Sequence, residues 1–386
     1  MTDKLMHNQF VMFLITIFIS ANLISYSLGN YDYNKFIYAV VFLIIYLNTR
    51  KIKISLISFI YFLVTIFISI LSVINFDFEA TKSYVFYFLF FSFFSFIVLS
   101  KVINFDLFFI SMSYILSLSL PILLYNVYTH DYDIGILLGI SYSMLPNFIA
   151  SLYVLINSKN LVNQFVAAIT VIISSYFFIT RGNRGVVLCI LIFFLLKILY
   201  KDKYSTGLRI FLTGVFGAVI FAVMSNISKV FFFLKDVLSY LHIEIYAIDK
   251  TLNLIIENQN LDSGRMFLFE KITSDIGGVK DILFGRGIGY FESINGVYTH
   301  NLFAQYFIEG GVIYLILPLF IVSIYLIKLF KMKNDKSNQE NVYFFFIVSV
   351  FIPLMLSNVY WVSPLYWFSV NYILLSISRK KLTIVL

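Results

Sequence analysis

The chain alternates long apolar runs with short polar stretches, and most of the runs approach the length needed to cross a bilayer. A helix needs about 20 apolar residues to cross the hydrocarbon core. The runs therefore predict about twelve transmembrane helices in an all-α polytopic membrane protein. The predicted spans lie near residues 10–28, 36–48, 55–75, 84–100, 107–127, 134–157, 165–179, 186–200, 210–227, 303–327, 342–356 and 365–377.

The composition favours the same class of protein. Of the 386 residues, 60% are hydrophobic and 12% are charged, whereas a soluble domain has about 45–50% apolar and about 25% charged residues. These values exclude a soluble enzyme, a disordered chain and a fibrous repeat. The single cysteine, Cys189, lies inside an apolar run, so we expect neither an intrachain disulfide nor a CxxC metal site.

The basic residues predict how the spans are oriented. With the N-terminus in the cytoplasm, seventeen Lys and Arg residues fall in cytoplasmic segments and only four in short external loops. This distribution follows the positive-inside rule. The first run begins near Phe10 and is too long for a signal-peptide core, so we interpret it as an uncleaved span. We expect both termini in the cytoplasm. We expect no nucleic-acid partner, because the formal charge of +8 comes from basic residues that the topology places in cytoplasmic loops.

One external loop is much longer than the others, and it divides the chain into three parts. Residues 1–227 hold spans one to nine, residues 228–300 form the loop, and residues 301–386 hold spans ten to twelve. Loops beyond about 15 residues usually carry function or their own structure. The helical spacing of apolar residues from Val230 to Leu241, and a second predicted helix over Met266–Ile276 that Asp262 or Ser263 could cap, indicate a small helical subdomain.

Arginines collect on the external side of this topology, where the charge rule disfavours them. They are Arg181 and Arg184 in one short turn, together with Arg265 and Arg286 in the long loop. Arginine binds phosphate through a planar fork that stays charged, so the cluster predicts a phosphorylated substrate. The alternatives are contact with lipid headgroups or ion pairs with Asp262, Glu270 or Asp281. For Arg181 and Arg184, which would point the same way in a helical turn, we favour the functional interpretation.

His300 lies where the long loop re-enters the membrane, on the Arg-rich side. A neutral imidazole is the usual general base at neutral pH, and the alternative is a packed interfacial residue. The glycines in Phe284–Phe291 lack the strand–turn–helix context of a nucleotide loop. We expect them to form a tight turn that brings Arg286, Gly287 and backbone amides toward a ligand. No metal is assigned to His130-Asp131-Tyr132-Asp133, because it is a short fragment without distant partners.

Transport is the competing class of function. Carriers place ionisable groups at mid-membrane on broken helices. The predicted spans are nearly free of charge, but Glu309 lies near the start of span ten and is followed by Gly310-Gly311. Glu309 could equally pair with an external arginine. A transporter or flippase of a lipid-linked saccharide therefore remains an alternative with little support.

Three segments of this chain resemble the O-antigen polymerase and O-antigen ligase superfamily. His300-Asn301, nine residues and then Gly311-Val312-Ile313-Tyr314 is similar to the pattern H-N-x9-G-x-x-Y. Ser263-Gly264-Arg265 followed by Phe284–Phe291 is similar to the S-G-R and G-x-G-x-G-x-F segment. Asn183-Arg184-Gly185 resembles the S-R-G element, with Asn in place of Ser. The motifs cover residues 180–314 in order, and the first 160 residues add only hydropathy.

The resemblance implies a metal-independent, cofactor-free glycosyltransferase of the membrane-embedded GT-C type that acts on undecaprenyl-pyrophosphate-linked oligosaccharides. Arg184 and Arg265 would clamp the departing pyrophosphate, with Arg181 and Arg286 in support. His300 would accept the proton of the attacking hydroxyl, and Asn301 would orient the imidazole or the sugar. We also expect Gly287, Glu309 and Tyr314, which lie in or near the motifs, to contact substrate.

Within that superfamily we favour polymerase over ligase. The high content of Phe, Tyr and Ile and the sparse match to the motifs suit the more variable polymerase branch, which is an argument by association. A polymerase transfers the growing glycan onto a lipid-linked repeat unit, whereas a ligase transfers it to lipid A-core. The expected location is the bacterial inner membrane with a periplasmic site, and a chain-length regulator and a flippase are candidate partners.

Overall fold

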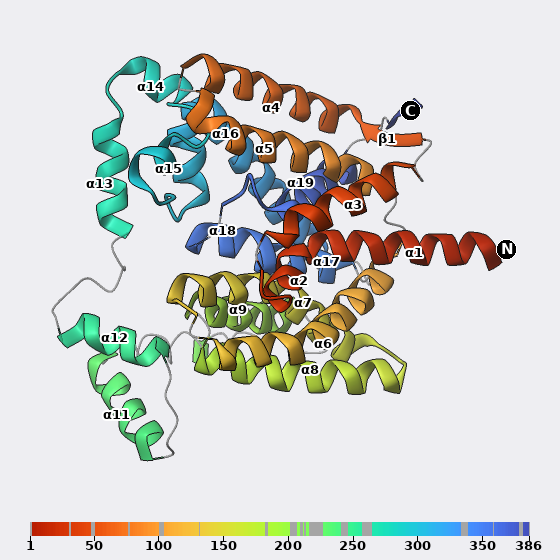
Figure 1. Ribbon diagram of the computed structural model, residues 1–386, viewed down its shortest axis with the longest axis vertical. Helices are drawn as coiled ribbons and strands as arrows, with labels where there is room; N and C mark the ends of the chain where they lie inside the picture. The colour runs from red at the N-terminus through yellow and green to blue at the C-terminus, as the bar shows by residue number, and fades with distance from the viewer. Residues whose placement is uncertain are drawn as a thin grey trace.

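The computed structural model describes most of the chain, and within that part the protein is helical apart from one pair of short strands (Figure 1). The described residues are 2–30, 32–47, 51–75, 78–99, 104–130, 132–181, 184–200, 207–208, 211, 214–215, 227–240, 246–256, 265–332, 339–357, 359–377 and 381–385.

The elements follow one another in a simple order. Those before the long loop are α1 (Thr2–Ile19), α2 (Ala21–Ser27), α3 (Tyr33–Leu47), β1 (Lys51–Ser55), α4 (Leu56–Asn75), α5 (Phe78–Leu99), α6 (Phe105–Thr129), α7 (Ile134–Asn157), α8 (Leu161–Thr180) and α9 (Arg184–Tyr200). Those that follow are α11 (Ile227–Tyr240), α12 (Tyr246–Ile256), α13 (Arg265–Asp275), α14 (Val279–Phe284), α15 (Tyr290–Asn295), α16 (Leu302–Met332), α17 (Gln339–Phe346), the π-helical segment η1 (Ile347–Phe351), α18 (Ile352–Leu356), α19 (Pro364–Ile377) and β2 (Lys381–Val385).

Several of these helices are long and apolar enough to cross a membrane. Within the described ranges four qualify by length and composition, namely Phe105–Thr129, Gly135–Asn157, Leu161–Thr180 and Leu302–Leu329. Four shorter apolar helices accompany them. The prediction of a helical protein is thus confirmed, and at least four of its described helices could span a membrane, while the count of twelve spans stays a prediction. The ninth predicted span, 210–227, lies largely outside the described residues.

The first predicted span is bent rather than straight. The helices Gln9–Ile19 and Ala21–Ser27 meet at 67° and would count as a fifth span if taken as one. Ser20 lies at the bend, where its hydroxyl accepts a 2.9 Å hydrogen bond from the Asn147 side chain. The same amide donates to the Met112 carbonyl at 2.9 Å. Inside an apolar bundle such polar contacts hold helices together, so the bend is tied to α6 and α7.

Local sequence explains where the neighbouring helices begin. Asn104 and Asn160 each accept hydrogen bonds from amides of the first turns of α6 and α8, and Asp133 does the same for α7. These side chains satisfy amides that have no partner inside the helix. The three long helices α6, α7 and α8 then pack side by side in the same half of the bundle (Figure 1).

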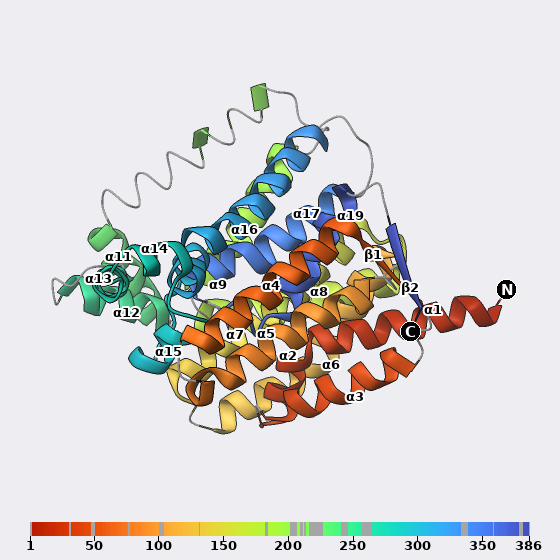
Figure 2. The ribbon, with the colours of Figure 1, turned by 90° about the horizontal axis from the view of Figure 1, so that it is seen from above.

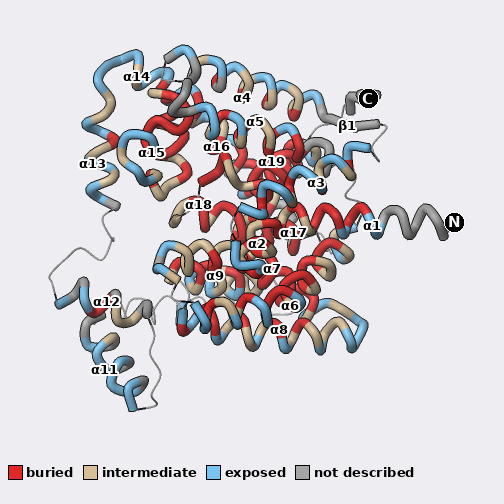
Figure 3. Tube along the Cα trace, in the orientation of Figure 1, coloured by how far each residue is buried: buried red, intermediate tan, exposed pale blue. Residues whose placement is uncertain are grey.

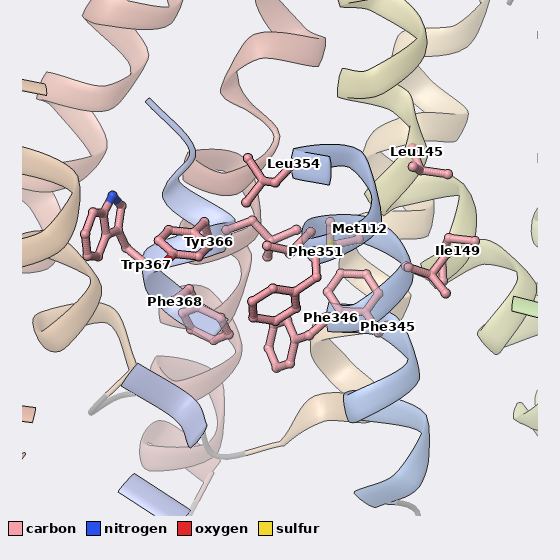
Figure 4. Close-up of a cluster of buried hydrophobic side chains, with 14 of the residues drawn as sticks. Met112, Leu145, Ile149, Phe345, Phe346, Phe351, Leu354, Tyr366, Trp367 and Phe368 are labelled. Carbon is pink, nitrogen blue, oxygen red and sulfur yellow. The ribbon is translucent and has the colours of Figure 1, made fainter. Parts of the chain in front are cut away.

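The core is shared by most of the helices, and α17, α18 and α19 contain many of the buried residues that Figure 3 colours red. Aromatic side chains dominate it, and Figure 4 shows part of the cluster. Phe346, Phe351 and Phe368 are among the buried rings, and the ring centres of Phe346 and Phe368 lie 5.8 Å apart. Most of the described buried residues are apolar, and a buried polar group that is not needed to hold the helices together is a candidate for function.

The long loop lies at the opposite end of the bundle from the strand pair. In Figures 1 and 2, α13, α14 and α15 lie far from β1 and β2, which pair antiparallel. The predicted helix over Met266–Ile276 is present as α13, and the proposed capping residues Asp262 and Ser263 lie outside the described residues. A small second core joins α13 and α15 to α16; it consists of Ile272, Tyr290, Phe291, Ala304 and Ile308.

Candidate functional site

Helix α16 is broken near its start. Backbone amides of the segment Phe284–Phe291, here called the glycine-rich loop, donate hydrogen bonds to carbonyls that the break leaves without helical partners. Gly311 has φ 68° and ψ −163°, which is not helical. The carbonyls of Ile308 and Glu309 accept hydrogen bonds from the amides of Arg286 at 2.7 Å and Gly287 at 2.9 Å. Such pairing is needed because an unpaired carbonyl is costly in an apolar environment.

The glycines of the loop are required for this close approach. A Cβ on Gly285 would lie 2.4 Å from the backbone of Glu309, and one on Gly311 would lie 2.3 Å from the backbone of Leu283. The expectation that amides of the loop point toward a ligand is therefore wrong for Arg286 and Gly287. Their N–H groups are used inside the protein, because the broken helix offers carbonyls that need donors.

Arg286 is also held by its own loop. Its Nη2 lies 2.8 Å from Asp281 Oδ2 and donates to the Asp275 carbonyl at 2.6 Å. The guanidinium carbon lies 5.6 Å from the centre of the Tyr290 ring. Of the two interpretations offered by the sequence for this arginine, the ion pair with Asp281 is the one present. A part in phosphate binding stays a prediction.

His300 occupies a sharp turn immediately before α16. Its φ is 54°, the only positive φ among the described non-glycine residues. Its ring lies 4.3 Å from the Tyr298 ring, and its Nδ1 lies 3.5 Å from Ser357 Oγ. Tyr298 donates a 2.7 Å hydrogen bond to the Ser357 carbonyl. Non-glycine residues with a positive φ are uncommon and cluster at functional sites. The contacts around His300 therefore hold its backbone in a conformation that costs free energy.

A cavity of about 410 Å³ opens beside His300. Its walls come from α2, α7, the turn before α16, η1 and the segment that joins α18 to α19. The polar lining includes Asn22, Tyr26, Tyr142, Ser143, Tyr298, His300, Ser349, Ser357 and Ser363. No Asp, Glu, Lys or Arg is among the described residues that line it. The volume lies within the range of about 300–1,000 Å³ typical of small-molecule sites.

The start of α9 adjoins the same cavity. A Cβ on Gly185 would lie 2.3 Å from Tyr142 Oη and 3.5 Å from Leu356 Cδ1. Tyr142 lines the cavity, and Leu356 directly precedes Ser357. Arg184, half-buried at the first residue of α9, is therefore placed next to the wall that His300 shares.

The other predicted arginines are placed differently. Arg181 is exposed at the C-terminal end of α8, with its guanidinium carbon 5.8 Å from the centre of the Tyr128 ring. It does not share a helical turn with Arg184, because α8 ends before α9 begins. Arg265 is the first residue of α13, and its side chain lies outside the part of the chain whose side chains are described.

Asn301 has a structural task. Its Oδ1 accepts hydrogen bonds from the amides of Phe303 at 3.0 Å and Ala304 at 3.1 Å. These contacts make it the N-terminal cap of α16. Asn301 therefore helps to fix the turn beside His300, since the helix already uses its carboxamide oxygen.

A buried polar network centred on Glu309 lies about two turns further along α16. Glu309 is 1% exposed, and its carboxylate accepts hydrogen bonds from Gln305 at 2.5 Å, from Trp361 at 3.1 Å and from the Tyr360 hydroxyl. The Tyr360 hydroxyl also lies 3.3 Å from that of Tyr314. Among the described contacts Glu309 has neutral partners only, so the predicted pairing with an external arginine is not seen.

Gln305 connects this network to the turn that holds His300. Its amide nitrogen donates to Glu309 and also to Glu292 at 2.7 Å. Its carbonyl oxygen lies 2.9 Å from the Thr299 hydroxyl. Burial raises the pKa of Glu292 to about 7. Sequence reasoning missed Gln305 and Glu292, although the spacing of Gln305 and Glu309, four residues apart on one helix, indicates a shared face.

Comparisons with known proteins leave the family of this chain open. No protein-family model matches it, and no curated protein matches it.

Proposed function

We propose that the protein is a membrane-embedded glycosyltransferase that polymerises a surface polysaccharide such as O-antigen. It transfers the growing glycan from undecaprenyl pyrophosphate onto a lipid-linked repeat unit. The observation that carries the proposal is the polar cavity beside His300, whose wall includes Tyr142, the residue against which Gly185 packs directly after Arg184. The two motifs lie more than one hundred residues apart in the sequence.

The chemistry needs a base and an anion site at these two places. The acceptor hydroxyl attacks the anomeric carbon, and the bond from that carbon to the pyrophosphate oxygen breaks. His300 takes the hydroxyl proton, and the electron pair leaves with the pyrophosphate. Arg184 and the N-terminal end of α9 offer positive charge for the departing anion. Such preorganised electrostatic stabilisation is usually the largest contribution to catalysis.

Arg265 completes the proposed pyrophosphate clamp with Arg184. Arg181 would support the clamp, whereas Arg286 is already paired with Asp281, which favours a structural part for that residue. Removal of one preorganised donor costs about 2.7–4 kcal/mol in comparable sites. Arg265→Ala and Arg184→Ala are therefore expected to lose about 10²–10³ in rate.

The proposal includes a location and partners. The site would face the periplasm of the bacterial inner membrane, with both termini in the cytoplasm and about twelve spans in a GT-C-like arrangement. The lipid bilayer and an undecaprenyl-pyrophosphate-linked oligosaccharide are the expected partners. The placement of α13–α15 opposite the strand pair in Figure 1 agrees with such a topology.

A transporter or flippase of the same lipid-linked saccharide is the second candidate. The observation that favours it is the break in α16 at Gly311 beside the buried Glu309, since carriers place ionisable groups on broken helices. We rank it second because the amides of Arg286 and Gly287 already satisfy the carbonyls freed by the break.

The decisive experiment uses purified protein and radiolabelled lipid-linked repeat units in vesicles. Wild type should make a ladder of chain lengths, and EDTA should not stop it. His300→Ala should insert normally and make no polymer, whereas His130→Ala, at the exposed end of α6, serves as the control. Translocation without polymer would favour the flippase.

In cells, a deletion that leaves lipid A-core with one repeat unit indicates a polymerase, and accumulated lipid-linked polymer indicates a ligase.

A further inference from the structure

We infer that the cavity beside His300 is a subsite for a neutral saccharide, and that Ser349 is a residue that binds it. This inference rests on the proposed function, because it assigns the cavity to the acceptor sugar of the same reaction. It goes further in separating the sugar site from the diphosphate site and in naming a residue that no motif contains.

The first observation is the backbone around Ser349. The residue lies in η1 (Ile347–Phe351), a π-helical segment inside an otherwise α-helical stretch. π-helical turns are rare, and they occur frequently at functional sites. The extra residue per turn changes which side chains face the cavity, and Ser349 is among the residues that line it.

The second observation is an unsatisfied hydroxyl. Ser349 is 7% exposed, and its Oγ has no hydrogen-bond partner among the described residues. A buried hydroxyl without a partner costs free energy. Because Ser349 also lines the cavity, a ligand hydroxyl or amide bound there can supply the missing hydrogen bond.

The lining decides the class of ligand. The described wall carries hydroxyl, amide and imidazole groups together with the aromatic side chains of Tyr26, Tyr142 and Tyr298, and it carries no Arg or Lys. A diphosphate needs cations, which the protein offers outside this wall at Arg184. Hydroxyl donors and acceptors between apolar ring faces instead suit a neutral, polyhydroxylated ring.

Two glycines make room for the tyrosines that shape the site. A Cβ on Gly139 would lie 2.3 Å from Tyr26 Oη, and one on Gly185 would lie 2.3 Å from Tyr142 Oη. Each tyrosine therefore extends across a helix surface that any larger residue would block. The two phenol groups lie in the wall of the cavity as a result.

The test is the variant Ser349→Ala, with Ser174→Ala as the matched control. Ser174 is also fully buried with an unpartnered hydroxyl, but it lies in α8 and does not line the cavity. In vesicles with donor and acceptor varied separately, Ser349→Ala should raise the KM for the lipid-linked acceptor about tenfold, as expected for one lost hydrogen bond. The KM for the donor and the value of kcat should stay within about twofold, because uniform binding was removed.

A second measurement separates binding from folding. Removing an unsatisfied hydroxyl should leave the Tm of the ligand-free protein unchanged or higher in both serine variants. The repeat-unit oligosaccharide, released from its lipid, should raise the Tm of wild type and raise that of Ser349→Ala much less. An unchanged acceptor KM in Ser349→Ala would overturn the assignment, and so would an equal shift in both proteins. Wild type that binds the oligosaccharide but makes no polymer would overturn the proposed function and leave the saccharide site standing.

Discussion

The side-chain carbonyl of Gln305 lies 2.9 Å from the hydroxyl of Thr299, the residue that precedes His300. The carboxamide can turn only this way, because its nitrogen donates to both Glu292 and Glu309. The two buried carboxyl groups therefore fix the direction of Gln305, and Gln305 fixes the turn. His300 keeps its positive φ because that turn is held from both sides.

The variant Thr299→Val tests this positioning role. It keeps the shape and the backbone N–H but removes the hydroxyl, so the His300 turn should loosen. We expect kcat to fall about tenfold to hundredfold with little change in KM, since small misplacements of a catalytic group have effects of that size. Thr299→Ser, which retains the hydroxyl, should recover most of the activity. Equal kcat in wild type and Thr299→Val would show that the contact does not position His300.

The contact between the glycine-rich loop and α16 can be tested with two glycines that share a positive φ. Gly285 and Gly296 both have φ 67°, but ψ is −168° at Gly285 and 1° at Gly296, so Gly285 is the more strained position for any other residue. A Cβ on Gly285 would also meet the backbone of Glu309, whereas one on Gly296 would meet nothing within 4 Å. Gly296→Ala should cost about 1–2 kcal/mol of stability from backbone strain alone. Gly285→Ala should cost clearly more, because the loop must also move away from the helix break. Thermal unfolding in detergent measures both, and equal losses would show that the close packing contributes nothing.

Sequence reasoning reached those parts of the site that carry charge or a motif. The sequence predicts His300 and Arg184 as site residues; His300 lines the cavity, Gly185, which follows Arg184, packs against the lining residue Tyr142, and the catalytic role of both stays a prediction. The ion pair of Arg286 with Asp281 is one of the alternatives that the sequence leaves open for the external arginines. Only 12% of the residues are charged, so each charged residue stands out in the sequence. For this reason the sequence alone can propose charged site residues.

Neutral partners could not be found in this way. Ser357 and Ser349 are two serines among many, and they reach His300 or its cavity only after more than forty residues of chain return to the site. The sequence also does not predict which groups pair with the backbone at the break in α16. Gly310-Gly311 is conspicuous in the sequence. The sequence does not show, however, that the carbonyls freed by the break accept hydrogen bonds from the amides of Arg286 and Gly287.

The raised pKa of Glu292 makes stability depend on pH. The folded protein holds the proton up to a pKa of about 7, whereas an unfolded glutamate loses it near 4.5. Between these values the folded state binds more protons, so stability should fall as pH rises from about 4.5 to about 7. Glu292→Gln should flatten this part of the profile, and Glu270→Gln, an exposed residue of α13, is the control. A wild-type Tm that stays constant from pH 5 to 7 would contradict the raised pKa.

The predicted sidedness can be tested with cysteine labelling, for which the chain is well suited. The only native cysteine, Cys189, is fully buried, so background labelling should be low. Thr273 is exposed on α13 in the long loop, and Lys159 is exposed between α7 and α8, in a segment predicted to be cytoplasmic. In intact spheroplasts a membrane-impermeant maleimide should label Thr273→Cys, because the long loop is expected outside the membrane. Lys159→Cys should react only after the membrane is opened. Labelling of Lys159→Cys alone in intact cells would reverse the orientation, and it would place the cavity at the wrong face for a periplasmic polymerase.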